Sequence, residues 1–311
     1  MAGNTENVTN QKLLNWLRAL RLQFYPMTWL AYTLGALGAA AIQGRLDPGA
    51  YWLGYAVAFL VEAATVFTND LFDYESDRHN RHASQFNGGS RTLVDGRLSK
   101  TDLSWGAAAC VLLAVLLTAA LLLRYDLGLA VALLFAAMLA LGPGYTTPPL
   151  KLAWRGLGEL DVALTHSTAA ILCGFIVQGA SWTHPFPWLV SAPLFLAILP
   201  SILLAGLPDL EADKAAGKRT LVVRLGRRPT ALIALLVTLA VPLSVVLIGY
   251  AASTRGVLAE LPPWSALHSL LLAALIFRYW KTPVTGRIDG LLIVALTYTL
   301  WYSVVPIMNL L

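Results

Sequence analysis

Charged residues are scarce in this sequence. Asp, Glu, Lys and Arg make up 13% of its 311 residues, whereas soluble domains carry about 25%. Hydrophobic residues account for 57%, and the net charge is only +5. The composition therefore excludes an ordinary soluble domain and indicates a protein that resides in the membrane lipid, with no nucleic-acid partner.

Cysteine and targeting signals are also lacking. The two cysteines, Cys110 and Cys173, both lie in apolar stretches and are interpreted as core residues, not as a disulfide or a metal pair. Residues 1–15 are polar and contain no apolar core of a signal peptide, so they predict a flexible cytoplasmic segment. No linker long enough to separate two domains is present, so residues 1–311 are expected to form one polytopic membrane domain.

Long apolar runs fill the rest of the chain. At about 20 residues per span, the sequence predicts an all-α integral membrane protein with nine transmembrane helices around a central cavity. The expected ranges are 23–43, 50–69, 103–123, 127–144, 160–181, 187–208, 230–250, 261–278 and 289–308.

The distribution of basic residues predicts an orientation. With nine spans, most of the 22 lysines and arginines fall on one side, and only Arg45, Arg124 and Arg255 fall on the other. Because positive loops stay in the cytoplasm, the N-terminus and the acidic clusters described next are expected there. The expected location is a prokaryotic cell membrane.

An acidic cluster follows the second predicted span. On a helical wheel with Asn69 at zero, Asp73, Asp77 and Asp70 lie at about 40°, 80° and 100°, while Glu75 points away. Acids crowded on one helical face repel one another, so this arrangement favours a bound cation.

A second, shorter cluster follows the sixth predicted span. Asp209 and Asp213 are one helical turn apart, and Glu211 is offset by about 200°. A related segment follows each cluster, GGSRTLVDGRLS at 88–99 and AGKRTLVVRLG at 216–226, with Arg91 matching Arg219. This repeat favours a duplicated four-helix unit that would bring two similar helix ends to one pocket.

Two facing carboxylate clusters are typical of a site that binds a diphosphate through Mg²⁺, because Mg²⁺ prefers oxygen ligands and is commonly shared with phosphates. The ions would neutralise the charge that grows as a C–O bond breaks. Basic residues on the same side are available to contact the anion. They are Arg21, Arg78, Arg91, Lys151, Lys214, Lys218 and Arg219.

The clusters and the segment between them resemble the UbiA superfamily of intramembrane prenyltransferases. Residues 69–77, NDLFDYESD, match its NDxxDxxxD motif, and Asp209 to Asp213 with Lys214, Gly217, Lys218 and Thr220 resembles its second signature. The segment YTTPPLKLAWRGLGEL at 145–160 resembles its Tyr-x-x-x-Pro region, and Arg21 resembles an arginine of its first helix. The resemblance covers nearly the whole chain.

The resemblance implies Mg²⁺-dependent transfer of a prenyl group from a polyprenyl diphosphate, through an allylic carbocation, to a lipid-soluble or aromatic acceptor. The implied metal ligands are Asn69, Asp70, Asp73, Asp77, Asp209 and Asp213. The five aspartates and Tyr145 form the expected catalytic set. The expected diphosphate contacts are Arg21, Arg78, Lys151, Lys214 and Lys218, whereas Glu75 and Glu211 are not expected to bind metal.

Glu62 lies inside a predicted span, on the same helical face as Asn69 and about 10 Å deeper. A carboxylate within a membrane span is a functional candidate, and Glu62 is predicted to contact the acceptor. The alternative is a hydrogen-bonded structural glutamate. Asp161 and His166, in the fifth span, are weaker candidates.

The acceptor and the reaction type have alternatives. Naphthoquinone prenyltransferases carry Asn-x-x-Arg before the second signature, where this chain has Ala205-Gly206-Leu207-Pro208, so an aromatic or quinone-precursor acceptor is predicted without further detail. The same ionisation without an acceptor would make a terpene cyclase, with aromatics such as Phe67, Trp154, Tyr298 and Trp301 around the cation. A cation-coupled transporter is a third alternative, although transporters place coupling acids nearer the membrane centre.

Overall fold

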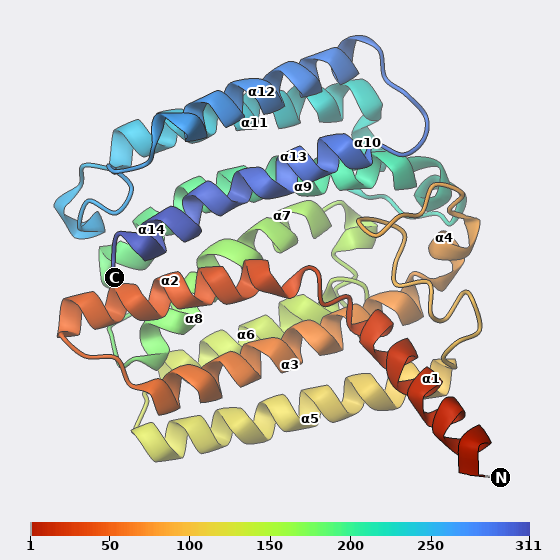
Figure 1. Cartoon of the computed structure of the whole chain (residues 1–311), viewed down its shortest axis with the longest axis horizontal. Coiled ribbons are helices and arrows are strands. Elements are labelled where there is room, and N and C mark those ends of the chain that lie inside the picture. Colours follow the sequence, from red (N-terminus) through yellow and green to blue (C-terminus); the bar gives the residue numbers. More distant parts are fainter. Residues whose placement is uncertain (1) are drawn as a thin grey trace.

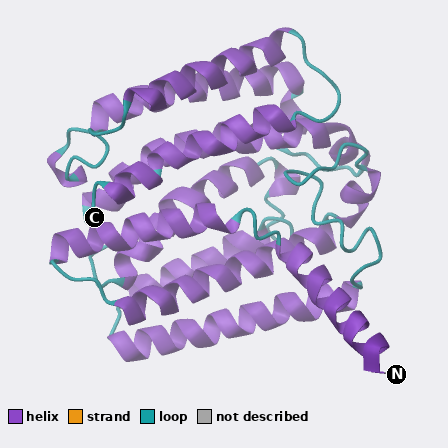
Figure 2. Ribbon diagram, in the orientation of Figure 1, coloured by secondary structure: helices purple, strands orange, loops and turns teal. Residues whose placement is uncertain are grey.

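The computed structural model describes residues 2–311, with side chains from Asn10 onward, and these residues form helices joined by loops and no strand (Figure 2). The helices are α1 Ala2–Leu20, α2 Tyr25–Gln43, α3 Pro48–Phe72, α4 Tyr74–His79, α5 Lys100–Tyr125, α6 Leu129–Gly144, α7 Gly158–Leu164, α8 Ala170–Val177, α9 Pro185–Ala215, α10 Leu221–Leu225, α11 Arg227–Ile248, α12 Pro263–Lys281, α13 Asp289–Tyr298 and α14 Val304–Met308. Short 3₁₀ turns occur at Ala153–Arg155, Ala252–Thr254 and Thr299–Tyr302, and a π-helical turn, Thr165–Ala169, joins α7 to α8.

The all-helical membrane fold is confirmed, but the count of nine spans is not. Each predicted range overlaps a helical segment, yet within residues 2–311 six segments are long and apolar enough to cross a membrane: α3, α5, α7–α8, α9, α11 and α13–α14. Helix α6 is apolar but shorter, and α1, α4 and α10 lie outside the predicted ranges. Residues 2–15 of the segment predicted to be flexible belong to α1, and Met1 lies outside the described residues.

The long helices run side by side, and α1 projects from one end of the bundle (Figure 1). Helices α5 and α11 are largely unburied and expose side chains such as Leu116, Leu123 and Leu247. In contrast, every residue of α8 is buried, and α9 packs against α11, α13 and α7. Apolar side chains on the outer helices can face lipid without loss of free energy, so these two surfaces suit a bilayer.

Glycines allow α2 and α8 to pack closely. A Cβ on Gly35 would collide with the carbonyl oxygen of Ile171, and one on Gly174 would collide with the carbonyl oxygen of Tyr32. Small residues at a helix crossing let membrane helices approach to backbone contact. This contact fixes α2, whose first turns line the cavity described below.

Candidate active site

The two aspartate motifs lie at the same end of the bundle, where α3 and α9 both end and where α4 and α10 follow (Figure 1). The helical wheel assumed one unbroken helix from Asn69 through Asp77, and this assumption is wrong. Helix α3 ends at Phe72, Asp73 stands between α3 and α4, and Asp77 belongs to α4. The first motif therefore bends around the helix break, while the second lies on the continuous helix α9.

A cavity of about 270 Å³ opens between these motifs. Its polar part is lined by Asn69, Asp73, Asp77, Asp209, Asp213 and Lys218. Its remaining walls are mostly apolar and include Met27, Val61, Met138, Ile198 and Leu296. The cavity thus combines a charged end with an apolar interior, which suits a ligand with a charged head and an apolar tail.

Lys218 joins the two motifs. Its buried ammonium group lies 2.8 Å from Oδ2 of Asp73 and 3.1 Å from Oδ1 of Asp213. Burial alone would lower the pKa of Lys218, but the two carboxylates raise the pKa well above its ordinary value. Trp154 completes this contact by donating its indole N–H to Oδ1 of Asp73 at 3.1 Å.

The carboxylates of the second motif accept hydrogen bonds from the first motif and its loop. Oδ1 of Asp209 accepts from the side-chain amides of Asn80 at 2.6 Å and Asn87 at 2.5 Å. Oδ1 of Asp213 accepts from the hydroxyl of Ser76 at 2.5 Å. These contacts hold the loop after α4 over the end of α9.

Asp70 has a different environment from the other aspartates. It accepts from the backbone N–H of Ser90 at 2.9 Å and from the Ser90 hydroxyl, and it is not among the residues that line the cavity. In this structure Asp70 therefore holds the loop, and a turn of its side chain or of the loop would be needed to bring it to a ligand.

Gly89 has no side chain, which leaves room for the carboxylate of Asp77 beside it. Gly89 has φ of 69°, and a Cβ at this position would collide with Oδ2 of Asp77. Burial raises the pKa of Asp77 well above its ordinary value, and the neighbouring carboxylates of Asp73 and Asp70 raise it further. Burial and the neighbouring carboxylates therefore disfavour the ionised form of Asp77, which a nearby cation would stabilise.

The five basic residues predicted to contact a diphosphate occupy unequal positions. Arg21 and Lys218 line the cavity. Arg78 is exposed and pairs with Glu75 at 3.2 Å, and Lys214 is exposed. Lys151 lies over the Trp154 ring, 4.9 Å from its centroid, and is not in the lining. Of these five basic residues, only Arg21 and Lys218 line the cavity.

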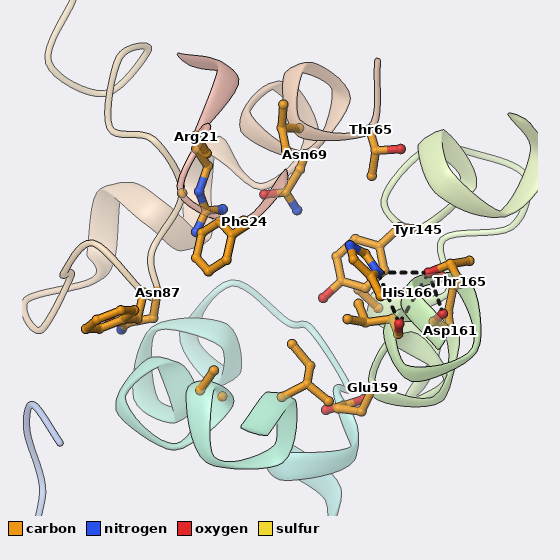
Figure 3. A pocket seen from close by; sticks show the side chains of 18 of the residues that line it. Arg21, Phe24, Thr65, Asn69, Asn87, Tyr145, Glu159, Asp161, Thr165 and His166 are labelled. Carbon is orange, nitrogen blue, oxygen red and sulfur yellow. Dashed lines mark hydrogen bonds between the residues drawn. The ribbon is translucent and has the colours of Figure 1, made fainter. Parts of the chain in front are cut away.

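The remaining predicted residues also line the cavity. Figure 3 shows Arg21 and Phe24 on one side of the cavity and Tyr145, His166 and Asp161 on the other. Glu62 also lines the cavity, and its Oε1 lies 4.0 Å from Nε2 of His166. Burial raises the pKa of Tyr145, which favours its neutral phenol.

Several residues of the site were not foreseen. Glu159 lines the cavity and accepts from the backbone N–H of Val222, and Asn80, Asn87 and Ser90 bind the aspartates across long stretches of chain. The one sequence signal for Glu159 is its position inside the segment 145–160, which carries the Tyr-x-x-x-Pro pattern. The aromatic residues of the lining are Phe24, Phe86 and Tyr145, not the four named from the sequence.

The donor types suit Mg²⁺, but the carboxylates do not form a closed coordination sphere. No group of three or more His, Cys, Asp or Glu side chains within the described part of the chain is arranged to hold a metal ion directly. Instead, the carboxylates form ion pairs or hydrogen bonds with protein side chains, which are Lys218, Asn80, Asn87 and Ser76. The motif aspartates that line the cavity outnumber the two basic residues there, Lys218 and Arg21, so their oxygen atoms and excess negative charge fit a divalent cation. They are Asp73, Asp77, Asp209 and Asp213.

This fold and cavity define a multi-pass helical membrane protein with a carboxylate-rich binding site at one end. The model of the UbiA prenyltransferase family matches residues 29–289, most of the chain. The chain belongs to this family and is a prenyltransferase, as the motifs predict.

Relatives differ in the acceptors that their names state. The chain is 28% identical to a 2-carboxy-1,4-naphthoquinone phytyltransferase of Synechocystis over 84% of this chain and 78% of the relative. It is 27% identical to a lycopene elongase/hydratase of Corynebacterium glutamicum over 70% and 72% of the two chains. It is also 26% identical to a 1,4-dihydroxy-2-naphthoate octaprenyltransferase of Haemophilus influenzae over 71% and 72%.

Solved structures share the fold. A UbiA homologue from Aeropyrum pernix in its apo form matches with a TM-score of 0.71 and 19% identity, covering 91% of this chain and 98% of the other. A UbiA homologue from Archaeoglobus fulgidus, bound to DMAPP and Mg²⁺, matches with a TM-score of 0.64 and 18% identity, covering 94% and 98%.

Proposed function

We propose that this protein transfers a prenyl group from a polyprenyl diphosphate to an aromatic or quinone-precursor acceptor within the membrane, in a reaction that depends on Mg²⁺. The observation that carries the proposal is the meeting of two aspartate motifs at one cavity, with Lys218 between Asp73 and Asp213. The Archaeoglobus homologue, which binds DMAPP and Mg²⁺, supports the choice of donor and metal. The names of the Synechocystis and Haemophilus relatives support the acceptor class.

The residues at the charged end of the cavity would bind the metal and the diphosphate. Asn69, Asp73, Asp77, Asp209 and Asp213 would hold Mg²⁺, with Asp70 as a further ligand if its loop moves. Mg²⁺ supplies positive charge that stabilises the departing diphosphate. Lys218 and Arg21 bind the diphosphate oxygens, since both line the cavity, and a charged donor strengthens each hydrogen bond.

The apolar part of the cavity would hold the prenyl chain and the acceptor. Its methionine and leucine side chains exclude water, which protects an allylic carbocation from hydrolysis. Neutral Tyr145 lies in the lining beside the charged end, where its ring can stabilise the cation. By the excess of basic residues on its side, this end of the bundle faces the cytoplasm.

The proposal is tested with purified protein in liposomes that contain Mg²⁺ and geranylgeranyl diphosphate. Diphosphate release and lipid products are measured with and without ring-hydroxylated aromatic acceptors. Release that depends on an acceptor, with a prenylated product, is the expected result. A cyclic hydrocarbon formed without acceptor would identify a terpene cyclase instead, and no release would favour a transporter.

The lycopene elongase/hydratase relative adds one acceptor to this assay. Lycopene is apolar and has no ring hydroxyl, so it separates two acceptor chemistries that the same charged end could serve. Prenylation of lycopene and not of the aromatic compounds would overturn the aromatic acceptor while retaining prenyl transfer.

A further inference from the structure

Glu62 and His166 form a polar pair inside the apolar part of the cavity, away from the aspartates. Glu62 lies on α3 about 10 Å, or two helical turns, before Asn69. His166 lies on the side of the cavity formed by α7 and α8, in the turn between these helices (Figure 3). Both line the cavity, and their side chains are 9% and 21% exposed. Ionisable groups at this depth in a membrane protein indicate function.

The turn that carries His166 is π-helical, spanning Thr165–Ala169. A π-helical turn inserts an extra residue into a helix and frequently occurs at functional sites. Here it follows α7 directly and turns His166 into the cavity, while the Ser167 hydroxyl donates to the carbonyl of Ala163.

Hydrogen bonds determine which nitrogen of His166 carries the proton. Nδ1 lies 3.1 Å from the carbonyl oxygen of Val162 and 3.1 Å from Oγ1 of Thr165. The Thr165 hydroxyl donates its own proton to the carbonyl of Asp161 at 2.8 Å. Both neighbours of Nδ1 are therefore acceptors, so Nδ1 carries the proton and Nε2 of the neutral ring has a free lone pair.

That lone pair faces Glu62. Nε2 lies 4.0 Å from Oε1 of Glu62, which is too long for a direct hydrogen bond. Two acceptors at this separation leave a position between them within reach of both. A ligand hydroxyl at this position donates its one proton to Nε2, and the carboxylate of Glu62 then lies close enough to stabilise the positive charge that the imidazole ring gains.

The geometry points to His166 as the general base for an acceptor that carries a ring hydroxyl, with Glu62 stabilising the imidazolium that forms. This inference rests on the proposed prenyl transfer and specifies its acceptor as a phenol or naphthol. With the ring hydroxyl bound at His166, the ring carbon next to it is the expected position of attachment for the prenyl C1 released at the aspartates.

Nε2 of His166 takes the phenol proton, and the oxygen electron pair enters the ring. The C–O bond to diphosphate breaks with its electrons on the diphosphate, and the ring carbon bonds to C1 of the prenyl group. The ring C–H proton is then lost to water or diphosphate, the ring regains aromaticity, and the imidazolium returns its proton to the oxygen.

Two conservative substitutions test the pair. His166→Asn keeps a side-chain donor for the Val162 carbonyl but removes Nε2, and Glu62→Gln keeps the shape of the carboxylate but removes its charge. Glu211→Gln, at an exposed carboxylate paired with Arg227 outside the cavity, is the matched control. All are assayed as the full chain in liposomes with Mg²⁺, geranylgeranyl diphosphate and either 1-naphthol or 1-methoxynaphthalene.

The methoxy compound has no proton to give, so it isolates the role of the base. With 1-naphthol, we expect His166→Asn to lower kcat about 100-fold and Glu62→Gln to lower it about tenfold. With 1-methoxynaphthalene, wild type and His166→Asn should be equally slow. The KM for geranylgeranyl diphosphate should stay within about twofold in all variants, because the charged end is unchanged.

Other outcomes overturn the inference in distinguishable ways. An equal loss with both acceptors would assign His166 a structural role. A loss specific to 1-naphthol in Asp161→Asn, with His166→Asn unaffected, would assign the base to Asp161, which lines the same cavity. Diphosphate release with no product from either ring compound would overturn the acceptor class, and no release by wild type would overturn the proposed function as well.

Discussion

The two aspartate motifs line one cavity but differ in their backbone structure. The first is interrupted at Asp73, where α3 gives way to α4, whereas the second lies on the unbroken helix α9. Each motif is bound by donors that follow the other: Lys218, after the second, contacts Asp73, and Asn87, after the first, contacts Asp209. Neither half can reach this arrangement alone, so the site forms only when the two halves of the bundle pack together.

Asp73 should be the most sensitive position in this pairing, because it alone contacts Asn69, Trp154 and Lys218 together. Asp73→Asn removes a charge from the diphosphate site and is expected to lower kcat about 10³-fold, as measured by prenylated product in liposomes. Glu75→Gln, on the exposed face of α4, is the control. A rate for Asp73→Asn within threefold of wild type would contradict the assigned role.

Lys218→Met tests whether the lysine holds the motifs together in the absence of metal. The substitution leaves the carboxylates of Asp73 and Asp213 buried without their shared cation, which destabilises a protein by about 3–5 kcal/mol. Thermal unfolding in EDTA should show a lower Tm than wild type.

Mg²⁺ should restore more of the stability of Lys218→Met than of wild type, since a ligand that binds only the folded state stabilises it. The measurement is the rise in Tm between EDTA and saturating Mg²⁺ for each protein. Equal rises would mean that the ion and the ammonium group do not share these carboxylates.

Gly89→Ala tests the close approach of the first loop to Asp77. The added methyl group would displace the carboxylate, and we expect transfer to fall about 100-fold, which corresponds to loss of one well-placed charged contact. Gly96→Ala is a matched control, because Gly96 has a similar φ of 66° but no atom within 4 Å of its added Cβ.

Both glycine variants should lose about 1 kcal/mol of stability from the left-handed backbone conformation, measured by thermal unfolding. Only Gly89→Ala should lose transfer activity. Similar activity losses in the two variants would attribute the effect to backbone strain instead of the collision with Asp77.

Asn87→Ala should have the smallest effect, because Asp209 keeps its hydrogen bond from Asn80. Loss of one hydrogen bond to a carboxylate is worth about 1.5 kcal/mol, so transfer should fall about tenfold. Gln85→Ala, exposed in the same loop, is the control. Combining Asn87→Ala with Asp209→Asn should add little further loss if both act through this bond.

Composition and motif spacing predicted the helical regions and the main carboxylates, but they did not predict the contacts within the site. Apolar runs predicted the helical regions because burial in lipid requires length and low charge, and the motifs predicted which carboxylates matter. The break at Asp73 was missed, since a helical wheel assumes an unbroken helix. Asn87 and Ser90 were not predicted as partners of the aspartates, because they lie in a loop whose path depends on tertiary packing. The many basic residues on this side of the protein did not distinguish buried Lys218 from exposed Lys214.

Helix α9 has a consequence for kinetics. Its 31 residues span about 46 Å, some 15 Å more than the hydrocarbon core of a bilayer. We therefore expect Asp209 and Asp213, in its last turns, to lie in the headgroup layer. A lipid with a diphosphate head would reach them by lateral diffusion, so the reaction velocity should follow the mole fraction of substrate in the bilayer and not its amount per volume of water.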